Sequence, residues 1–237
     1  MDMNSLLSNF LATDKPLLPS PLATRVALQL IWALVLGSGA GLLACKLVRP
    51  SRLAVVVCVM VWTLLPGSVS PAYWLGLAFQ TPSLMSGAMG LVYLFTLLRR
   101  EPVRGLVIAA GERGNLHVLT ISAVVLGWVL LLDTLAWLPV SVYAWGFDTA
   151  AFALVTVFIV LLWALSGGQA ALRSARLSAP ALVLVVLTLF VLTRLPTGNV
   201  WDALLDPWLW VALQVLWLFR AVCWVKAAWR RSPPIRA

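Results

Sequence analysis

One carboxylate, Asp133, stands inside an otherwise apolar segment, Leu130-Leu131-Leu132-Asp133-Thr134-Leu135. An ionisable side chain within a membrane is costly, and it usually faces the interior of a helix bundle or a water-filled cavity. Counting back from Val140, the expected end of this apolar run, puts Asp133 roughly 10 Å inside the outer boundary. Asp133 is therefore a candidate proton- or cation-binding carboxylate. The alternative is a structural carboxylate near the interface, hydrogen-bonded to a neighbouring helix or reached by water.

A few other polar residues would lie at a similar depth in the apolar runs. Gln29 and Gln214 fall one or two helical turns from the expected outer surface, and Gln80 joins them if its helix is kinked at Pro82. Arg194 is the nearest plausible counter-ion for Asp133. These residues could form an outward-facing polar pocket. The alternative is hydrogen bonding between helices, with each bond worth only about 0.6–2 kcal/mol.

Other chemistry is poorly represented in the sequence. His117 is the single histidine, and haem ligation or histidine catalysis would need further ligands or partners. The three cysteines lack C-x-x-C spacing, so they indicate neither a zinc site nor a disulfide framework. We predict no metal site and no cofactor. Enzymatic activity is not favoured, because the remaining acidic candidates lie in sequence contexts typical of turns: Asp148, Asp202 and Asp206.

Small residues recur at four-residue spacing in the first apolar run. They form an extended small-xxx-small face that contains a true G-x-x-x-G: Ala33, Gly37, Gly41 and Cys45. A shorter version lies at Ser86 and Gly90. Such faces let two helix backbones approach closely. We expect another helix to pack here, and a helix of the same chain is favoured over a helix of a partner subunit.

The amino-acid composition indicates whether these helices are surrounded by water or by lipid. Of the 237 residues, 62% are hydrophobic and 11% are charged, and the mean hydropathy is +0.99. Soluble domains carry roughly 45–50% apolar and about 25% charged residues. A water-soluble fold could not bury this much apolar surface, so the sequence predicts an all-α, polytopic transmembrane helix bundle with the lipid bilayer as its surroundings.

The apolar runs divide the chain into a short N-terminal segment, a membrane domain and a basic tail. Residues 1–22 should be extracytoplasmic and carry a short amphipathic helix on the membrane surface. Residues 226–237 form the tail. Residues 23–225 hold about seven spans, at roughly 23–47, 53–68, 74–98, 117–140, 147–165, 178–195 and 207–225. Residues 53–98 are uncharged and are flanked by basic residues on both sides. Because both flanks should lie in the cytoplasm, we infer that this stretch crosses the membrane twice; one span with a re-entrant segment is the alternative.

The basic residues give the orientation. The net charge is +9, and nearly all Lys and Arg residues lie in alternate loops and in the tail, which predicts N-out, C-in by the positive-inside rule. No soluble segment is long enough to present a basic face to nucleic acid. We expect the following residues to anchor the chain to cytoplasmic headgroups: Arg49, Arg52, Arg99, Arg100, Lys226, Arg230 and Arg231.

Three classes of function follow, in order of preference. The first is a structural, assembly or accessory subunit of a membrane complex, with other membrane subunits as partners. The second is a small transporter or permease-like carrier with a polar site around Asp133. The third is a membrane-embedded enzyme. The preference for Arg over Lys and the many Ala, Leu and Val residues suggest a bacterial protein of GC-rich origin, in the inner membrane.

Overall fold

A computed structural model describes residues 18–99, 113–165 and 178–231, with the side chains of these except 113–115 and 224–231. Within these ranges every regular element is a helix and there is no strand, which confirms the all-α class. The expected amphipathic helix near the N-terminus, Arg100 and the last residues of the tail lie outside the described residues. So do the side chains of Lys226, Arg230 and Arg231.

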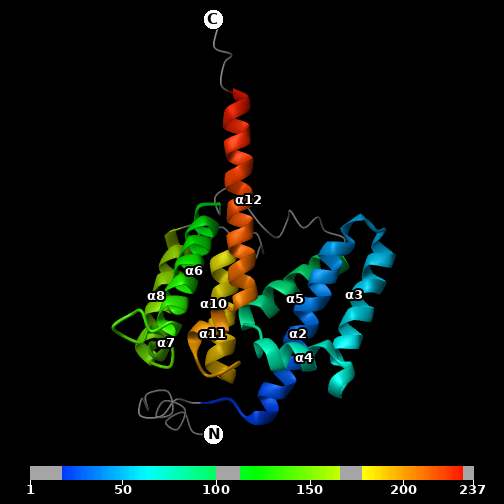
Figure 1. The fold of residues 1–237 in the computed structure, drawn as a ribbon, viewed down its shortest axis with the longest axis horizontal. Coiled ribbons are helices and arrows are strands. Elements are labelled where there is room, and N and C mark those ends of the chain that lie inside the picture. Colours follow the sequence, from blue (N-terminus) through cyan, green and yellow to red (C-terminus); the bar gives the residue numbers. More distant parts are fainter. Residues whose placement is uncertain (1–17, 100–112, 166–177, 232–237) are drawn as a thin grey trace, which may run out of the picture.

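The first half of the described chain forms four α-helices and two short 3-10 helices. In chain order these are α2 (Pro21–Leu43), the 3-10 helix Ala44–Lys46, α3 (Arg49–Leu64), the 3-10 helix Gly67–Val69, α4 (Pro71–Phe79) and α5 (Leu84–Arg99). Helices α2 and α3 lie side by side and antiparallel, and α4 crosses below α5 (Figure 1).

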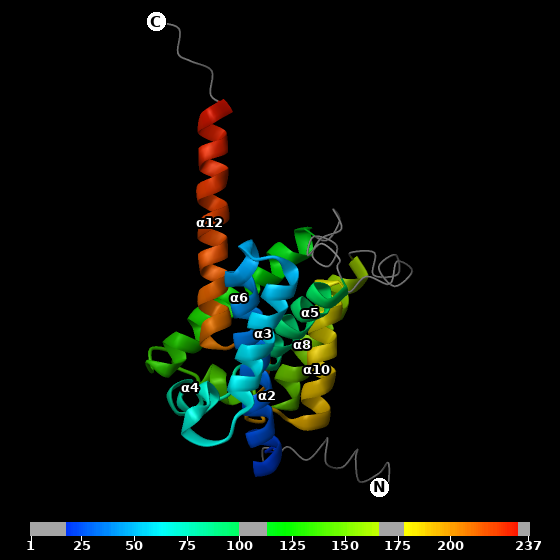
Figure 2. The same ribbon diagram turned by 90° about the vertical axis from the view of Figure 1, so that its right-hand side faces the viewer.

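The second half of the described chain forms four long helices and two short ones. It contains α6 (Arg113–Thr134), α7 (Val142–Trp145), α8 (Thr149–Leu165), α10 (Ala179–Thr193), α11 (Val200–Leu204) and α12 (Pro207–Arg231). Helices α6, α8 and α10 stand together, whereas α12 packs on α6 near its start and then projects far beyond the other described helices (Figures 1 and 2).

Most of the starts of these helices can be explained from the local sequence. Ser20, Ser70 and Ser178 each accept a hydrogen bond from a backbone N–H of the first turn, and a proline follows within the first two helical positions. A serine cap satisfies an N–H that has no partner within the helix, and proline loses nothing there because its N–H would be unpaired anyway. These signals set where α2, α4 and α10 begin.

Helix α6 ends earlier than its apolar run predicts. The expected span reached residue 140, but the helix stops at Thr134. The N–H of Ala136 donates to the carbonyl of Asp133 and the N–H of Trp137 to that of Leu132, with Ala136 in the left-handed region at φ 56°. This is a Schellman motif with alanine where glycine is usual. Asp133 thus lies in the last turn of its helix, not well inside it.

The expected span 74–98 is not one helix. It is divided into α4 and α5 by residues 80–83, where Gln80 has φ 59° and ψ −151°. Glycine alone adopts this region at little cost. Pro82 removes a backbone donor at the same place, so α4 cannot continue into α5. The short helices α7 and α11 were not expected either.

Two hydrophobic cores hold the molecule together, and α5 takes part in both. The core of the second half joins α8, α10 and α11 through residues such as Ile159, Leu187 and Phe190, and Leu84 and Met85 at the start of α5 pack against it. The core of the first half contains Val56 of α3 and Leu94 and Leu97 near the end of α5. Helix α5 therefore connects the two halves.

The small-residue face of α2 turns toward α3 and α5. Ala33, Gly37 and Gly41 are buried, whereas Cys45 lies in the following 3-10 helix and is exposed. A Cβ added at Gly41 would come within 2.9 Å of Val56 in α3 and within 2.8 Å of the Tyr93 hydroxyl in α5. The helices that cover this face belong to the same chain.

Candidate functional site

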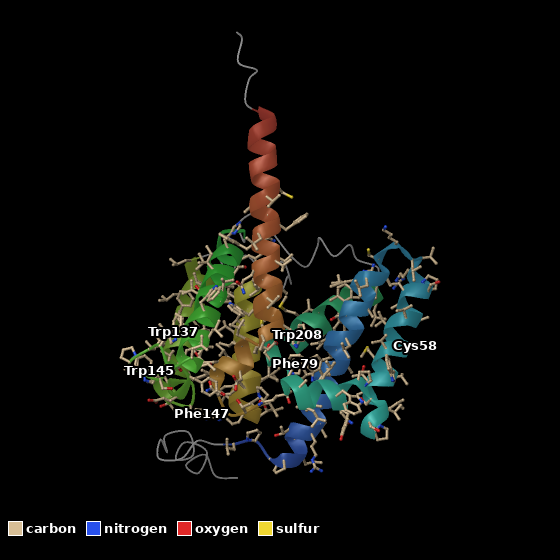
Figure 3. All side chains as sticks on the ribbon, viewed as in Figure 1. Cys58, Phe79, Trp137, Trp145, Phe147 and Trp208 are labelled. Atoms are coloured by element: carbon tan, nitrogen blue, oxygen red, sulfur yellow. The ribbon has the colours of Figure 1, made fainter. Side chains whose placement is uncertain are left out.

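Two interruptions of the helical chain meet inside the molecule. One is the break between α4 and α5 at residues 80–83, and the other is the two-residue break between α11 and α12 at Leu205 and Asp206. They are more than 120 residues apart in the sequence, yet Ser83 and Asp206 are in direct contact. Figure 3 places Phe79, the last residue of α4, beside Trp208 in the first turn of α12, and their rings are 4.9 Å apart.

The carboxylate of Asp206 is surrounded by hydrogen-bond donors. Its Oδ2 accepts from the Ser83 N–H at 3.0 Å, from the Ser83 hydroxyl at 2.7 Å and from the Ser86 hydroxyl. Its Oδ1 accepts from the Leu209 N–H at 2.8 Å, which makes Asp206 the N-cap of α12. Ser83 in turn caps α5, because its hydroxyl oxygen accepts from the Ser86 N–H. One side chain thus joins the starts of two helices.

This junction is withdrawn from solvent. Ser83 is fully buried and Asp206 is 7% exposed. A buried charge is tolerated when it is hydrogen-bonded or compensated by nearby partial charges. Here the N-termini of α5 and α12 both point at the carboxylate, and each carries the positive end of a helix dipole. The four donors and the two helix ends together suit a negatively charged group.

The break on the α4 side is held by a third element. Trp32 of α2 is buried, and its indole N–H donates to the carbonyl oxygen of Gln80 at 2.9 Å. A residue in a sparsely populated backbone region persists when its surroundings over-determine it, and such residues gather at ligand clamps and switch regions. Trp32 on one side and the Asp206 junction on the other fix residues 80–83.

The chemistry available at this junction is that of a carboxylate with two hydroxyls. It can hold a proton or a cation. In the part of the chain that the structure describes, no group of three or more His, Cys, Asp or Glu side chains is placed to hold a metal ion.

Asp133, the carboxylate singled out from the sequence, has a different setting. Its Oδ2 accepts from the backbone N–H of Tyr143 at 2.7 Å and from the Ser141 hydroxyl at 3.4 Å. Both donors belong to the start of α7, immediately after the turn that follows α6. The side chain thus fastens α7 to the end of α6, which is the geometry of the structural alternative.

The other members of the expected polar pocket are spread over the molecule. Gln29 in α2 and Gln214 in α12 are half-buried, and the Gln80 side chain is exposed. Among the described residues, no hydrogen bond joins any of these glutamine side chains to Asp133. Arg194 is the left-handed C-cap of α10, and its guanidinium lies over the Phe190 ring at 5.5 Å. Asp133 instead bonds to residues close to it in the chain.

Two of the expected headgroup anchors bind helix ends. The Arg49 guanidinium donates to the carbonyls of Leu97, at 3.0 Å, and Leu98 in the last turn of α5. Arg52 donates to the Gly41 carbonyl near the end of α2, at 2.6 Å, and to the Tyr93 hydroxyl. The last carbonyls of a helix have no partner within it and carry partial negative charge. Arg99 is exposed at the end of α5.

The sequence predicts a turn at Asp206 and a helix-packing position at Ser86. The local signals for two helix starts were available: Pro82-Ser83 before a new apolar run, and Asp206-Pro207 before another. The contact between them carried no signal, because nothing in one sequence relates residues that far apart.

Comparison of the chain with protein families, with curated proteins and with solved structures finds no match.

Proposed function

We propose that this chain is a multi-pass integral membrane protein with about seven crossings, oriented N-out and C-in. The observation that carries the proposal is the exposure of large apolar side chains along the helices. On α6, for example, Val118, Ile121, Val125 and Trp128 are all exposed. In water such a surface would drive aggregation, whereas hydrocarbon solvates it.

Helix α12 strengthens this proposal. Leu216, Trp217, Leu218 and Phe219 are consecutive, and each is more than half exposed. Successive helical residues are about 100° apart, so four of them cover the whole circumference. A helix that is apolar all round suits a lipid environment.

The lengths of the helices are compatible with a crossing in two clear cases. Pro21–Lys46 and Leu116–Thr134 are long and apolar enough to span a membrane, and shorter apolar helices lie at Leu84–Arg99, Thr149–Leu165, Ala179–Thr193 and Pro207–Cys223. A short helix can complete a crossing when the adjoining irregular backbone is buried and hydrogen-bonded within the protein. The buried caps at Ser70 and Ser83 provide such satisfied breaks beside α4 and α5.

The distribution of charged and aromatic residues supports the orientation. The start of α2 and the end of α12 lie at opposite ends of the molecule (Figure 1). The basic residues Lys46, Arg49 and Arg52 gather at the turn between α2 and α3. The opposite end carries Trp137 and Trp145 beside α7 (Figure 3), and both are exposed. Basic residues favour the cytoplasmic side, and tryptophans favour membrane interfaces.

Within the membrane, we propose a structural, assembly or accessory role. In the described part of the chain, three carboxylates fasten helices together through their hydrogen bonds: Asp133 holds α7, Asp202 joins α11 to α7, and Asp206 holds α5 and α12. The exposed apolar surface of α12 offers a place for another membrane subunit. The amino-acid usage supports the inner membrane of a bacterium.

The accessory role can be tested by photo-crosslinking in the native membrane. A photoreactive amino acid at Leu218, on the exposed part of α12, should give an adduct with one distinct protein chain that also co-purifies in fixed stoichiometry. The same group at Leu154, an exposed residue of α8, serves as the control for general lipid-facing reactivity. Adducts with lipid alone, together with a monodisperse monomer, would contradict the role.

A small carrier is the second candidate, and one observation favours it. Transporters often bind their ligands where broken helices meet, with helix N-termini pointing at the site. The junction of the α4–α5 and α11–α12 breaks has this geometry, with Asp206 in place of the Asp133 pocket expected from the sequence. Loss of substrate uptake by Asp206→Asn, with normal uptake by Asp133→Asn, would favour this candidate.

A further inference from the structure

We propose that Asp206 is a proton-uptake site, and that its protonation releases α5 from the start of α12 and lets the two halves of the molecule part. The charged form would be the locked form. The proposal requires only that the chain folds as described, and it holds for an accessory subunit as well as for a carrier.

The hydrogen bonds of the junction explain why a proton would open it. All four partners of the carboxylate donate, and three of them donate to Oδ2. A proton on Oδ2 turns that oxygen into a donor and removes acceptor capacity. The two serine hydroxyls can rotate, but the Ser83 N–H is fixed by the backbone at the start of α5. It would donate to a neutral carboxyl, a weaker acceptor than the charged carboxylate, and a proton on Oδ1 would weaken the bond from the Leu209 N–H in the same way.

The described charged and titratable groups on the surrounding elements do not bond to Asp206. On α11, Asp202 accepts from the Tyr143 and Thr197 hydroxyls. On α10, the Arg194 guanidinium lies over Phe190. The other described titratable side chains on these helices make no hydrogen bond or ion pair with Asp206, which bonds to Ser83, Ser86 and Leu209: Tyr73 on α4, Tyr93 and Arg99 on α5, Asp133 and His117 on α6, and Arg220 and Cys223 on α12. Asp206 is thus the titratable group that contacts both breaks directly.

The packing shows what would move. Each half has its own core, but Leu84 and Met85 at the start of α5 also pack against the core of the second half, so parting of the halves must draw the start of α5 out of that core. The main contacts across the boundary are those of α5 with α10 and α11, the Phe79–Trp208 ring pair and the Asp206 junction. Gln80 supplies a hinge, because its backbone conformation is strained and is held by Trp32 and by the capped start of α5. Release of Asp206 removes one of these two restraints.

The test is a distance measurement between the halves as a function of pH. In a variant with Cys45, Cys58 and Cys223 replaced by serine, spin labels are placed at Leu77 on α4 and Val211 on α12, both exposed. The full chain is reconstituted in phosphatidylcholine vesicles. We expect a single distance at neutral pH and a longer, reversible second distance as the pH falls. Infrared spectroscopy follows the carboxylic acid band of Asp206, identified by its absence from Asp206→Asn.

Two serine variants sharpen the test. Ser86→Ala removes one donor to the charged carboxylate, so the pH midpoint of opening should rise by about one to two pH units. Ser178→Ala removes a buried cap of α10, away from the junction, and should leave the midpoint unchanged. Asp206→Asn should show the longer distance at every pH; if it does not fold, Ser86→Ala still decides the question. An unchanged distance while the Asp206 acid band appears, or a wild-type midpoint in Ser86→Ala, would overturn the proposal.

Discussion

Tyr143 joins two carboxylates at the end of the molecule that carries α7. Its backbone N–H donates to Asp133, and its phenol donates to Asp202 at 2.7 Å. Partial burial, followed by the hydrogen bond to Asp202, raises the pKa of Tyr143 above its usual value. The folded protein therefore holds the phenolic proton more tightly than the unfolded chain does. The stabilisation that results is complete at neutral pH and is lost as the pH rises beyond about 10.

Tyr143→Phe should lower the free energy of unfolding at neutral pH by about 1 kcal/mol, a modest value because Tyr143 is 38% exposed and water competes for the hydrogen bond. The difference from the wild type should shrink at about pH 11, where the phenol of the unfolded wild-type chain ionises. Thermal unfolding in detergent at both pH values measures this. An equal difference at the two values would mean that the phenol–carboxylate bond is not responsible.

At the scale of single residues, hydropathy identified Asp133 as unusual but could not give its depth. Leucines continue on both sides of it, so the apolar run reads as one span up to residue 140. The helix end is set by the left-handed Ala136, and alanine gives no signal for that conformation. The same limitation applies to Arg49 and Arg52, whose charge indicated a membrane surface while their partners are helix carbonyls.

At the scale of helices, glycine positions determine how closely neighbours approach. A Cβ added to Gly90 in α5 would lie 2.9 Å from the carbonyl oxygen of Leu34, which belongs to the backbone of α2 and cannot turn away. Gly39 in α2 has no atom within 4 Å of the added Cβ. Gly90 is therefore a position at which an added methyl group tests the packing of α2 on α5, and Gly39 is its matched control.

Gly90→Ala should lower stability by about 1–3 kcal/mol, because α5 must move away from α2. Gly39→Ala should be neutral or stabilising by up to about 1 kcal/mol, because alanine favours a helix more than glycine does. Chemical unfolding in detergent micelles provides the comparison. Equal effects of the two substitutions would show that α2 and α5 are not packed as described.

Much of the helical organisation could be predicted from the sequence. Serine–proline and proline signals predict the starts of α2, α4 and α10, and the small-residue face of α2 predicts close packing. The helix breaks were harder. Residues 74–98 carry no charge, so Pro82-Ser83 indicates a kink as readily as a break, and the conformation of Gln80 depends on Trp32, which lies 48 residues away. The junction of Ser83 and Asp206 is a contact of the tertiary structure, and periodicity within one segment cannot reveal it.

At the scale of the whole molecule, the chain forms two helical halves joined mainly through α5. The basic turn between α2 and α3 lies toward the end to which α12 projects, and α7 lies at the other end (Figures 1 and 2). This polarity, with apolar side chains exposed along the helices, underlies the proposed N-out, C-in topology. The crossing that most needs a direct test is the hairpin of α3 with α4 and α5, for which the alternative is one span and a re-entrant segment.

Cysteine labelling in intact cells tests this topology directly. Ser68 is an exposed residue between α3 and α4, and Cys45 is exposed in the turn between α2 and α3. With Cys58 and Cys223 replaced by serine in both, one variant keeps Cys45 and the other carries Cys45→Ser and Ser68→Cys. A membrane-impermeant thiol reagent should label the introduced thiol of Ser68→Cys at once, and Cys45 only after permeabilisation. Labelling of Cys45 from outside, or of the Ser68→Cys thiol only after permeabilisation, would contradict the seven-crossing, N-out account.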